Sequence, residues 1–245
     1  MSPLVFGPMG VEPDRLRHPL TGGPIMGVGI SGKIATGKST LAMEIMKHAK
    51  PGTLARPSRK LALADELKLM VGKMLYPWAH QQVGFPKDEI VLGWVQKNKH
   101  RLRGTLQDIG LLMREEAGES YWVDKMLSRV YNGGKWKPGG FIGVVDDVRF
   151  KSEFRVLREA GFLMVRLEVP KLQTWFEHPV YAQRRDTLYP NLPINQLEHQ
   201  SEVDLDDYAD DGHGATCFDI SLDCTLPSRD VFKSYYSQAQ RYKWA

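Results

Sequence analysis

The residues with the clearest chemical meaning are those at 32–39, which read Gly-Lys-Ile-Ala-Thr-Gly-Lys-Ser and match the phosphate-binding pattern G-x-x-x-x-G-K-[ST]. In such a loop, main-chain N–H groups surround phosphate oxygens, and the N-terminus of the following helix favours the negative charge. Lys38 is expected to reach the β- and γ-phosphates, and the Ser39 hydroxyl to bind Mg²⁺. The sequence therefore predicts a nucleoside triphosphate site formed by Gly32, Lys33, Ile34, Ala35, Thr36, Gly37, Lys38, Ser39 and Thr40.

The segments on either side of this loop support the prediction. Residues 25–30 are an apolar run that is typical of a strand, and residues 40–46 have the pattern of a helix. A phosphate-binding loop requires this order of strand, loop and helix. A chance match in a glycine-containing loop is therefore the less favoured reading.

A second group of polar residues follows the apolar run 141–145, which is typical of a parallel strand buried on both faces. Asp146 and Asp147 end this run, and Arg149 lies two residues further on. Ligands of open α/β sheets bind at the carboxyl ends of strands. We expect Asp147 to be on the metal side and Arg149 to grip an acceptor phosphate. The alternative is an aspartate that caps the next helix and an arginine in a surface ion pair.

Further candidates come from a predicted helix near residue 110. Gln107 and Arg114 are seven positions apart, so they share one helix face. Arg114 either points toward a cleft or pairs in solvent with Glu115 or Glu119, and the sequence leaves this open. Trp122 is more often a core residue than a platform for a nucleotide base.

Two arginines, Arg184 and Arg185, lie in a proline-containing stretch at 170–200 that we interpret as a lid. An arginine folded over a transferring phosphoryl group stabilises the charge of the transition state. A solvated basic pair in a loop is an equally good reading. The densest basic cluster, at 97–103, is interpreted as a solvated helix end in preference to a phosphate contact.

The remaining pattern alternates between helices and strands. After residues 1–24, predicted to be a loosely docked extension, it indicates an α/β sandwich around a parallel sheet. A strand is expected at about 60–64, and a helix from Asp65, which is predicted to be its N-cap. A capping box is expected at Thr105. The other expected helices are 88–97, 120–130, 151–160 and one from Ser228, and the other strands are 162–167 and 216–220.

Composition excludes several classes of protein. With 42% apolar and 25% charged residues among 245, the chain is an ordinary globular protein and is predicted to be cytoplasmic, without a membrane segment. Its two cysteines have neither CxxC spacing nor a nearby histidine pair, which argues against zinc. The net charge of +4 suits anionic ligands, but no basic run with interleaved aromatics predicts a nucleic-acid partner.

Taken in order, these motifs resemble the bacteriophage deoxynucleoside monophosphate kinases, a branch of the adenylate-kinase-like P-loop kinases. The resemblance rests on the loop at 32–39 and on the segments 63–68, 106–110 with Arg114 and Trp122, 145–149 with Glu153, and 199–202. It implies a P-loop NTPase three-layer sandwich with a five-stranded parallel sheet in a single domain at 25–245. An acceptor-binding helical insertion at about 65–132 and a lid at about 170–200 are also implied.

The resemblance further implies transfer of the ATP γ-phosphoryl group to a deoxynucleoside monophosphate with Mg²⁺, and it leaves a homodimer open. By position, it implies roles for Lys38, Arg114, Arg149, Arg184 and Arg185 in catalysis, and for Ser39 and Asp147 on the metal side. The acceptor-side candidates are Asp65, Lys68, Gln107, Arg114, Trp122 and Arg149. Two alternatives stay open: a kinase of another small phosphorylated metabolite, and a nucleotide-binding ATPase that is not a kinase.

Overall fold

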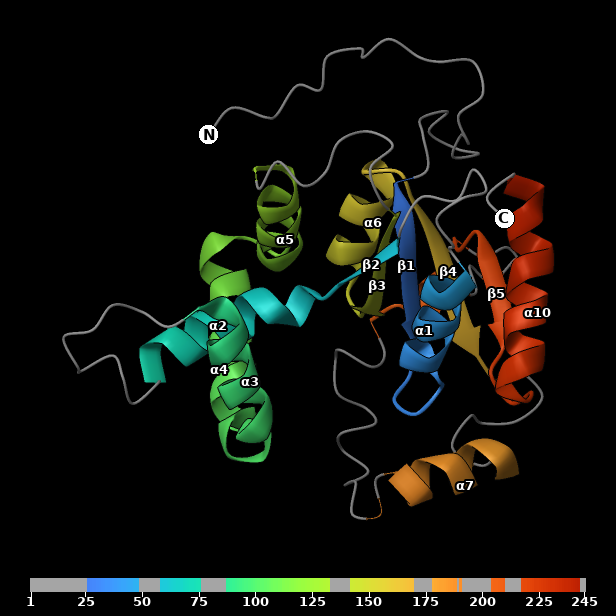
Figure 1. Cartoon of the computed structure of the whole chain (residues 1–245), viewed down its shortest axis with the longest axis horizontal. Helices are drawn as coiled ribbons and strands as arrows, with labels where there is room; N and C mark the ends of the chain where they lie inside the picture. The colour runs from blue at the N-terminus through green and yellow to red at the C-terminus, as the bar shows by residue number, and fades with distance from the viewer. Residues whose placement is uncertain are drawn as a thin grey trace, which may run out of the picture.

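The centre of the molecule is a parallel sheet of five strands in the order β2-β3-β1-β4-β5 (Figure 1). The strands are β1 (Gly27–Gly32), β2 (Ser58–Leu61), β3 (Ile142–Val148), β4 (Phe162–Glu168) and β5 (Ile220–Asp223). The computed structural model describes residues 26–48, 58–75, 87–132, 142–169, 178–188, 190, 204–209 and 217–242. The predicted extension at 1–24 and the segment 199–202 lie outside these residues.

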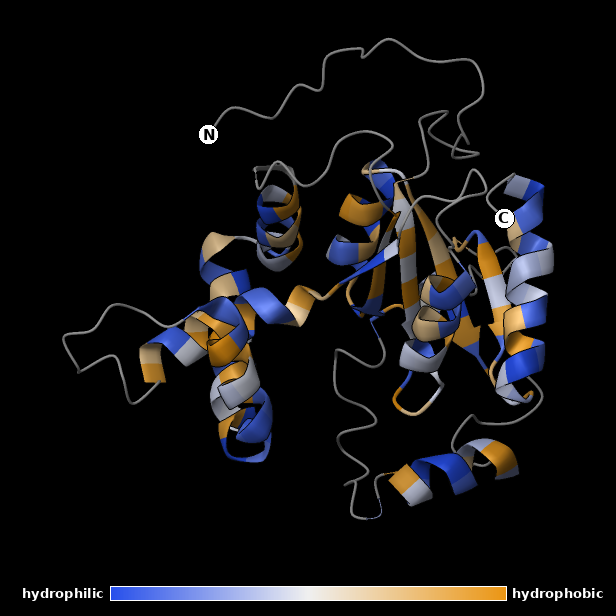
Figure 2. Cartoon of the chain, viewed as in Figure 1, coloured by the Kyte–Doolittle hydropathy of each residue, from blue (hydrophilic) through white to orange (hydrophobic). Residues whose placement is uncertain are grey.

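Two hydrophobic cores form because alternate strand residues point to opposite faces of the sheet. One face carries Val28, Ile30 and Val165, and packs against α1 (Lys38–His48) and α10 (Ser228–Ala239). The other carries Val145 and Met164, and packs against α5 (Tyr121–Asn132) and α6 (Lys151–Glu159). Apolar residues accordingly colour much of β4 and β5 in Figure 2. The result is the three-layer α/β sandwich that the sequence predicts.

A group of helices stands to one side of the sheet (Figure 1). It consists of α2 (Leu63–Leu75), α3 (Asp88–Lys97) and α4 (Lys99–Ala117), with α5 between this group and α6. Helix α4 has no buried residue among its 19. Within the described residues, no helix is long and apolar enough to cross a bilayer.

Several predicted boundaries are wrong. Thr105 lies inside α4 and is not a cap, because α4 already begins at Lys99. Helix α2 begins at Leu63, so Asp65 lies in its first turn and is not its N-cap. Strand β3 continues through both aspartates to Val148, and β5 covers 220–223 in place of 216–220.

The segment read as an irregular lid contains a helix, α7 (Pro179–Leu188), which carries Arg184 and Arg185. The loop interpretation rests on several prolines in 170–200, and one of them, Pro179, occupies the first position of α7, where its missing N–H has no helical partner to lose. Among the residues that the structure describes, two further short elements are α9 (Asp206–Ala209) and a 3₁₀ turn at Gln240–Tyr242.

Candidate functional site

The loop at 32–39 connects the end of β1 to the start of α1, as a phosphate-binding loop must. Gly32 and Gly37 have φ values of 154° and 93°, a region that favours glycine. A Cβ atom at Gly32 would lie 2.7 Å from Thr36 Oγ1 and 2.8 Å from the Leu167 carbonyl oxygen. The backbone is therefore packed too closely at Gly32 to admit a side chain.

Lys38 folds back onto this loop. Its Nζ donates to the carbonyl oxygens of Gly32, at 2.5 Å, and Lys33, at 2.7 Å. The Thr36 hydroxyl donates to the same Lys33 carbonyl at 2.8 Å. These bonds hold the ammonium group against the backbone of the predicted phosphate-binding loop.

Helix α7 docks on the loop through two side chains. The Tyr181 hydroxyl, which is buried, donates to the Ile34 carbonyl at 2.5 Å. Arg184 donates from Nη1 to the Cys224 carbonyl at 2.9 Å, and the same atom would lie 3.9 Å from a Cβ at Gly37. Arg185, in contrast, donates to the neighbouring Asp186 at 2.7 Å. Of the two arginines, Arg184 is thus the one beside the phosphate loop.

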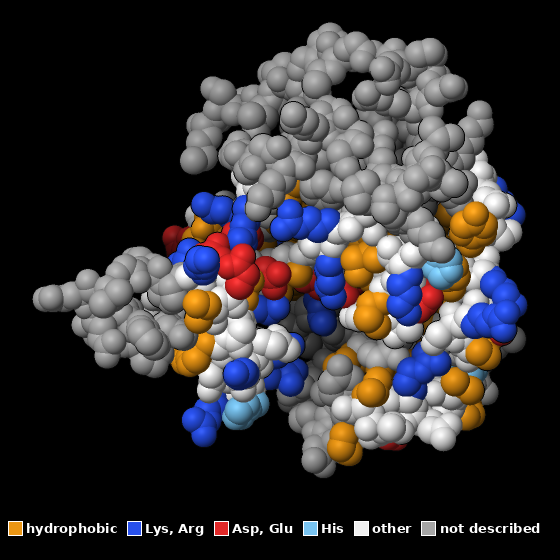
Figure 3. All heavy atoms as spheres, viewed as in Figure 1, with side chains coloured by type: hydrophobic (Ala, Val, Ile, Leu, Met, Phe, Trp, Pro, Cys, Tyr) orange, Lys and Arg blue, Asp and Glu red, His pale blue; other side chains and the backbone are white. Residues whose placement is uncertain are grey.

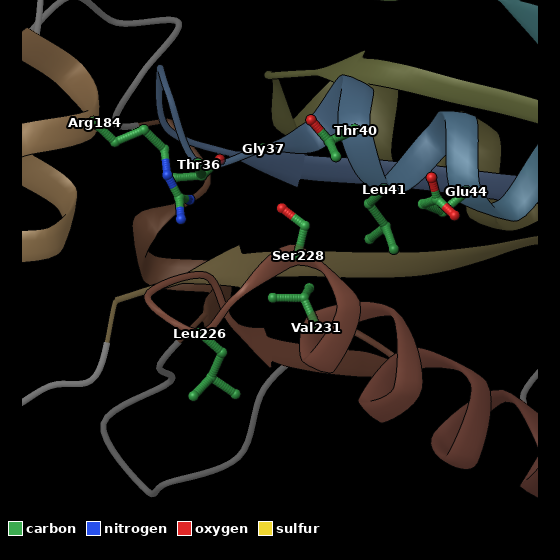
Figure 4. A pocket seen from close by; sticks show the side chains of 9 residues that line it. All are labelled: Thr36, Gly37, Thr40, Leu41, Glu44, Arg184, Leu226, Ser228 and Val231. Atoms are coloured by element: carbon green, nitrogen blue, oxygen red, sulfur yellow. The ribbon is translucent and has the colours of Figure 1, made fainter. Parts of the chain in front are cut away.

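A pocket lies where α7, the phosphate loop, α1 and α10 meet (Figure 4). In Figure 4 the Arg184 side chain extends from α7 toward Thr36 and Gly37, and the Ser228 side chain points toward α1. The pocket residues are Thr36, Gly37, Thr40, Leu41, Glu44, Arg184, Leu226, Ser228 and Val231.

The outer side of the loop is held by an ion-pair network. Lys33 Nζ donates to Asp206 Oδ2 at 2.5 Å, and Arg166 Nη2 donates to Asp206 Oδ1 at 2.7 Å. Arg166 is buried in β4 and also donates to Ser31 Oγ at 3.0 Å. Asp206 therefore links the loop to β4, next to β1 in the sheet.

The two aspartates of β3 have different partners. Asp146 is buried and pairs with Lys60 of β2 at 2.7 Å. Asp147 accepts from the backbone N–H groups of Leu63, at 3.2 Å, and Ala64, at 3.1 Å, so it satisfies the first amides of α2. Burial raises its pKa to about 6, with the charges of Glu153 and Asp146 adding to the rise and these N–H groups opposing it. The alternative from the sequence, an aspartate that caps the next helix, is wrong for Asp147, because it caps the earlier helix α2. The metal role of Asp147 stays a prediction.

Arg149 leaves β3 beside the point where the phosphate loop leaves β1. Val148 is paired in register with Ser31, so the next residues on the two strands are Arg149 and Gly32. Neighbouring strands of a sheet are only about 4.8 Å apart. The register therefore brings the predicted acceptor arginine and the predicted donor loop together at the carboxyl ends of two neighbouring strands.

Arg114 reaches across from α4 to the start of α6. It donates from Nη2 to Glu153 Oε1 and from Nη1 to the Glu119 carbonyl, at 2.9 Å for the second bond. Its guanidinium carbon lies 3.9 Å from the centre of the Phe150 ring. Arg114 is thus mostly buried and paired with Glu153, a partner that neither alternative from the sequence included.

Positive charges converge between α2, α4 and the end of β3. Lys99 is exposed as a residue, yet loss of hydration at its ammonium lowers its pKa, and so do the charges of Lys68, Arg149 and Arg103. Lys68 also donates to Asp65 at 2.9 Å. Figure 3 shows Lys and Arg side chains on both sides of a hollow near the middle of the visible face. An anion bound near these groups would offset the repulsion between their charges.

The remaining candidates from the sequence are exposed or are used for packing. Trp122 is buried, and its Nε1 donates to the Gly110 carbonyl at 3.1 Å, which is the core role favoured from the sequence. Gln107 is exposed on α4. Ser39 and Thr40 are exposed in the first turn of α1. The roles assigned to these residues in binding stay predictions.

Sequence reasoning missed four residues of the site: Lys99, Arg103, Glu153 as a partner, and Tyr181. Lys99 and Arg103 belong to the basic cluster at 97–103, which was read as a solvated helix end. Their spacing of four places them on one face of α4, which could have indicated a joint role. Nothing in the sequence near Tyr181 indicates that its hydroxyl reaches Ile34, 147 positions away.

No protein-family model matches the sequence, and no curated protein does. Among solved structures, a gluconokinase from Sinorhizobium meliloti 1021 is similar in 92% of this chain and 94% of that chain, with 16% sequence identity and a TM-score of 0.42. A likeness this low carries no information on the substrate of this chain.

Proposed function

We propose that this protein transfers the γ-phosphoryl group of ATP to the phosphate of a deoxynucleoside monophosphate. The observation that carries the proposal is the register between β1 and β3, which pairs Ser31 with Val148. The phosphate loop and Arg149 follow these two residues, so a triphosphate on the loop and an anion on Arg149 would face each other. Two phosphates held in this way are the reactants of a kinase.

The donor half rests on the phosphate loop. Bound phosphate oxygens would replace the Gly32 and Lys33 carbonyls as acceptors for Lys38 Nζ, and the amides at the start of α1 would bind the remaining oxygens. Arg184, beside Gly37, is the α7 arginine best placed to contact the triphosphate. The nucleoside would extend along the surface beside the small pocket lined by Thr40, Glu44 and Ser228.

We propose that Mg²⁺ accompanies ATP in this donor half, held largely by the phosphates. Within the described residues, no group of three or more His, Cys, Asp or Glu side chains is placed to hold a metal ion. Mg²⁺ in kinases is commonly bound by substrate phosphates, water and one or two protein oxygens. The Ser39 hydroxyl and the Asp147 carboxylate are the groups that we propose would hold it. The ion would shield the charge of the phosphates.

The acceptor half favours a phosphorylated substrate over a neutral sugar or alcohol. Burial lowers the pKa of Lys99, and the positive charges of Lys68 and Arg149 lower it further. A phosphate dianion would relieve this repulsion, whereas a neutral hydroxyl compound would not. Arg114, held on Glu153, adds a further guanidinium from α4.

The chemistry needs positioning and charge compensation, with no covalent intermediate. A phosphate oxygen of the acceptor would attack the γ-phosphorus in line, and the bond from this phosphorus to the β–γ bridging oxygen would break, so that ADP leaves. Lys38 and the surrounding arginines would stabilise the charge that develops. Holding both substrates in this geometry would lower the activation barrier by roughly 7–11 kcal/mol. The α7 helix, already docked on the loop by Tyr181, would help to exclude water.

An acceptor panel tests the proposal. ATP and Mg²⁺ are offered with each deoxynucleoside monophosphate, each ribonucleoside monophosphate, a phosphorylated metabolite without a base, and an unphosphorylated sugar acid. ADP release is followed by a coupled assay, and the phosphorylated product by chromatography. We expect diphosphate formation with at least one deoxynucleoside monophosphate. Turnover only on the sugar acid, or only as ATP hydrolysis, would contradict the proposal.

A further inference from the structure

We propose that Glu153 is a positioning residue that sets Arg114 and Arg149 for the acceptor phosphate. This inference rests on the proposed function, because it assigns Glu153 a task at the acceptor side of that same site. Glu153 is 3% exposed, and it lies in the first turn of α6. A carboxylate buried to this extent requires partners for both oxygens.

The two oxygens of Glu153 perform separate tasks. Oε2 accepts from the backbone N–H groups of Arg149, at 2.9 Å, and Phe150, at 3.1 Å. The bond to Phe150 is the ordinary capping contact of a glutamate three residues into a helix. The bond to Arg149 also fixes the backbone from which the acceptor arginine extends.

Oε1 binds the Arg114 guanidinium, which comes from α4 and is 39 positions away in sequence. Helix capping does not require this contact. A charge-assisted bond between two mostly buried groups is among the stronger polar interactions in a protein. One side chain therefore ties together the two arginines that arrive from different elements.

The geometry of Arg114 leaves it able to bind an anion while it is held. A guanidinium has five N–H groups. Among the described residues, its bonds to Glu153 and to the Glu119 carbonyl use two of them, and the Phe150 ring covers one face of the plane. The group is thus fixed in orientation by three contacts, and further N–H groups remain for a phosphate.

The test compares Glu153→Gln with Glu159→Gln. Glutamine can still accept the Arg149 and Phe150 N–H groups, but it removes the negative charge from Arg114. Glu159 lies on the same helix and is exposed, so its variant is a matched control for charge. Calorimetry measures the binding of ATP and of the common deoxynucleoside monophosphates to each full-length protein, and thermal unfolding is recorded alongside.

We expect Glu153→Gln to weaken monophosphate binding roughly tenfold or more, with ATP affinity within about twofold of wild type. Glu159→Gln should match wild type in both. In a cycle with Arg114→Ala, the double variant should bind monophosphate no worse than Arg114→Ala alone, because Glu153 acts through Arg114. Equal loss of both ligands in Glu153→Gln, unchanged monophosphate affinity, or additive losses in the cycle would overturn the inference.

If Glu153→Gln does not fold, Glu153→Asp keeps the charge on a side chain one methylene shorter and is expected to show the same selective loss. A folded Glu153→Asp variant with wild-type monophosphate affinity would equally overturn the inference. Binding also separates this inference from the proposed function. If the wild-type protein binds a monophosphate but transfers no phosphoryl group, the proposed kinase function is contradicted, and the binding measurements still test the role of Glu153. If the wild-type protein binds no monophosphate, both proposals are overturned.

Discussion

The phenolic hydroxyl of Tyr181 donates to the carbonyl oxygen of Ile34 at 2.5 Å, and this bond joins α7 to the middle of the phosphate loop. The next residue, Ala35, has a φ of 62°, an unusual value for a residue with a side chain. Tyr181 is 1% exposed, so the bond is sheltered from water. The loop conformation therefore depends on a helix that lies far from it in sequence.

Replacing Tyr181 with Phe is expected to loosen the phosphate loop. The Ile34 carbonyl loses its donor, which costs about 1–3 kcal/mol in the free energy of unfolding. ATP should bind several-fold more weakly because the loop is no longer held in its binding shape. Denaturant unfolding and ATP titration measure these effects. Tyr236→Phe, an exposed position on α10, is the control, and equal results for the two variants would contradict the expected role.

Lys38→Ala is expected to abolish most of the ATP-dependent turnover, with a fall of at least about 10²-fold in kcat. The fold should persist, because Lys38 Nζ donates to carbonyl oxygens of its own loop, those of Gly32 and Lys33. Steady-state kinetics and circular dichroism test the two parts. Lys233→Ala, at an exposed site on α10, should leave the rate unchanged. A wild-type rate in Lys38→Ala would show that the loop at 32–39 is not the donor site.

Arg149→Ala is expected to raise the KM for the acceptor by tenfold or more, on the order of a lost charge-assisted hydrogen bond, with little change in ATP affinity. The substitution keeps the backbone N–H that Glu153 accepts, so the cap of α6 remains intact. Arg155→Ala, on the exposed side of α6, is the matched control. A parallel loss of ATP and acceptor binding would count against a role confined to the acceptor.

Lys99→Met is expected to weaken acceptor binding while leaving the free energy of unfolding equal or higher. Loss of hydration, followed by the charges of Lys68, Arg149 and Arg103, lowers the pKa of Lys99, so its charged form is disfavoured in the folded protein. Removing that charge therefore relieves repulsion in the absence of ligand. Lys97→Met, in the same basic segment, should change neither property.

The same pKa gives a pH dependence with a definite sign. As pH rises through the lowered pKa of Lys99, the ammonium loses its proton, and the affinity for the acceptor should fall. This fall should occur at a lower pH than it would for an ordinary lysine, whose pKa is near 10.4. Over the same range the folded state becomes more stable, because the unfolded chain still binds the proton that the folded chain has released. Titration of acceptor affinity and unfolding in wild type and Lys99→Met would reveal the difference.

Much of the fold could be predicted because it is encoded locally. The apolar runs at 141–145 and 162–167 became β3 and β4, and the helices at 88–97 and from Ser228 were correctly located. The errors fall where local signals compete with longer-range ones. Thr105 carries a capping pattern, yet it lies inside a helix that begins at Lys99. The proline-containing stretch around Arg184 folds as α7, whose Tyr181 is buried against Ile34.

The loop at 32–39 could be located from the sequence alone, because the glycine positions and Lys38 lie within eight consecutive residues and their backbone requirements are local. The use of the other charged residues depends on contacts that exist only in the folded chain. Asp147 caps α2, and Glu153 binds Arg114. Each of these contacts joins elements that are distant in sequence, and a side chain of given charge acquires its role only from the partners that folding brings within a few ångströms of it.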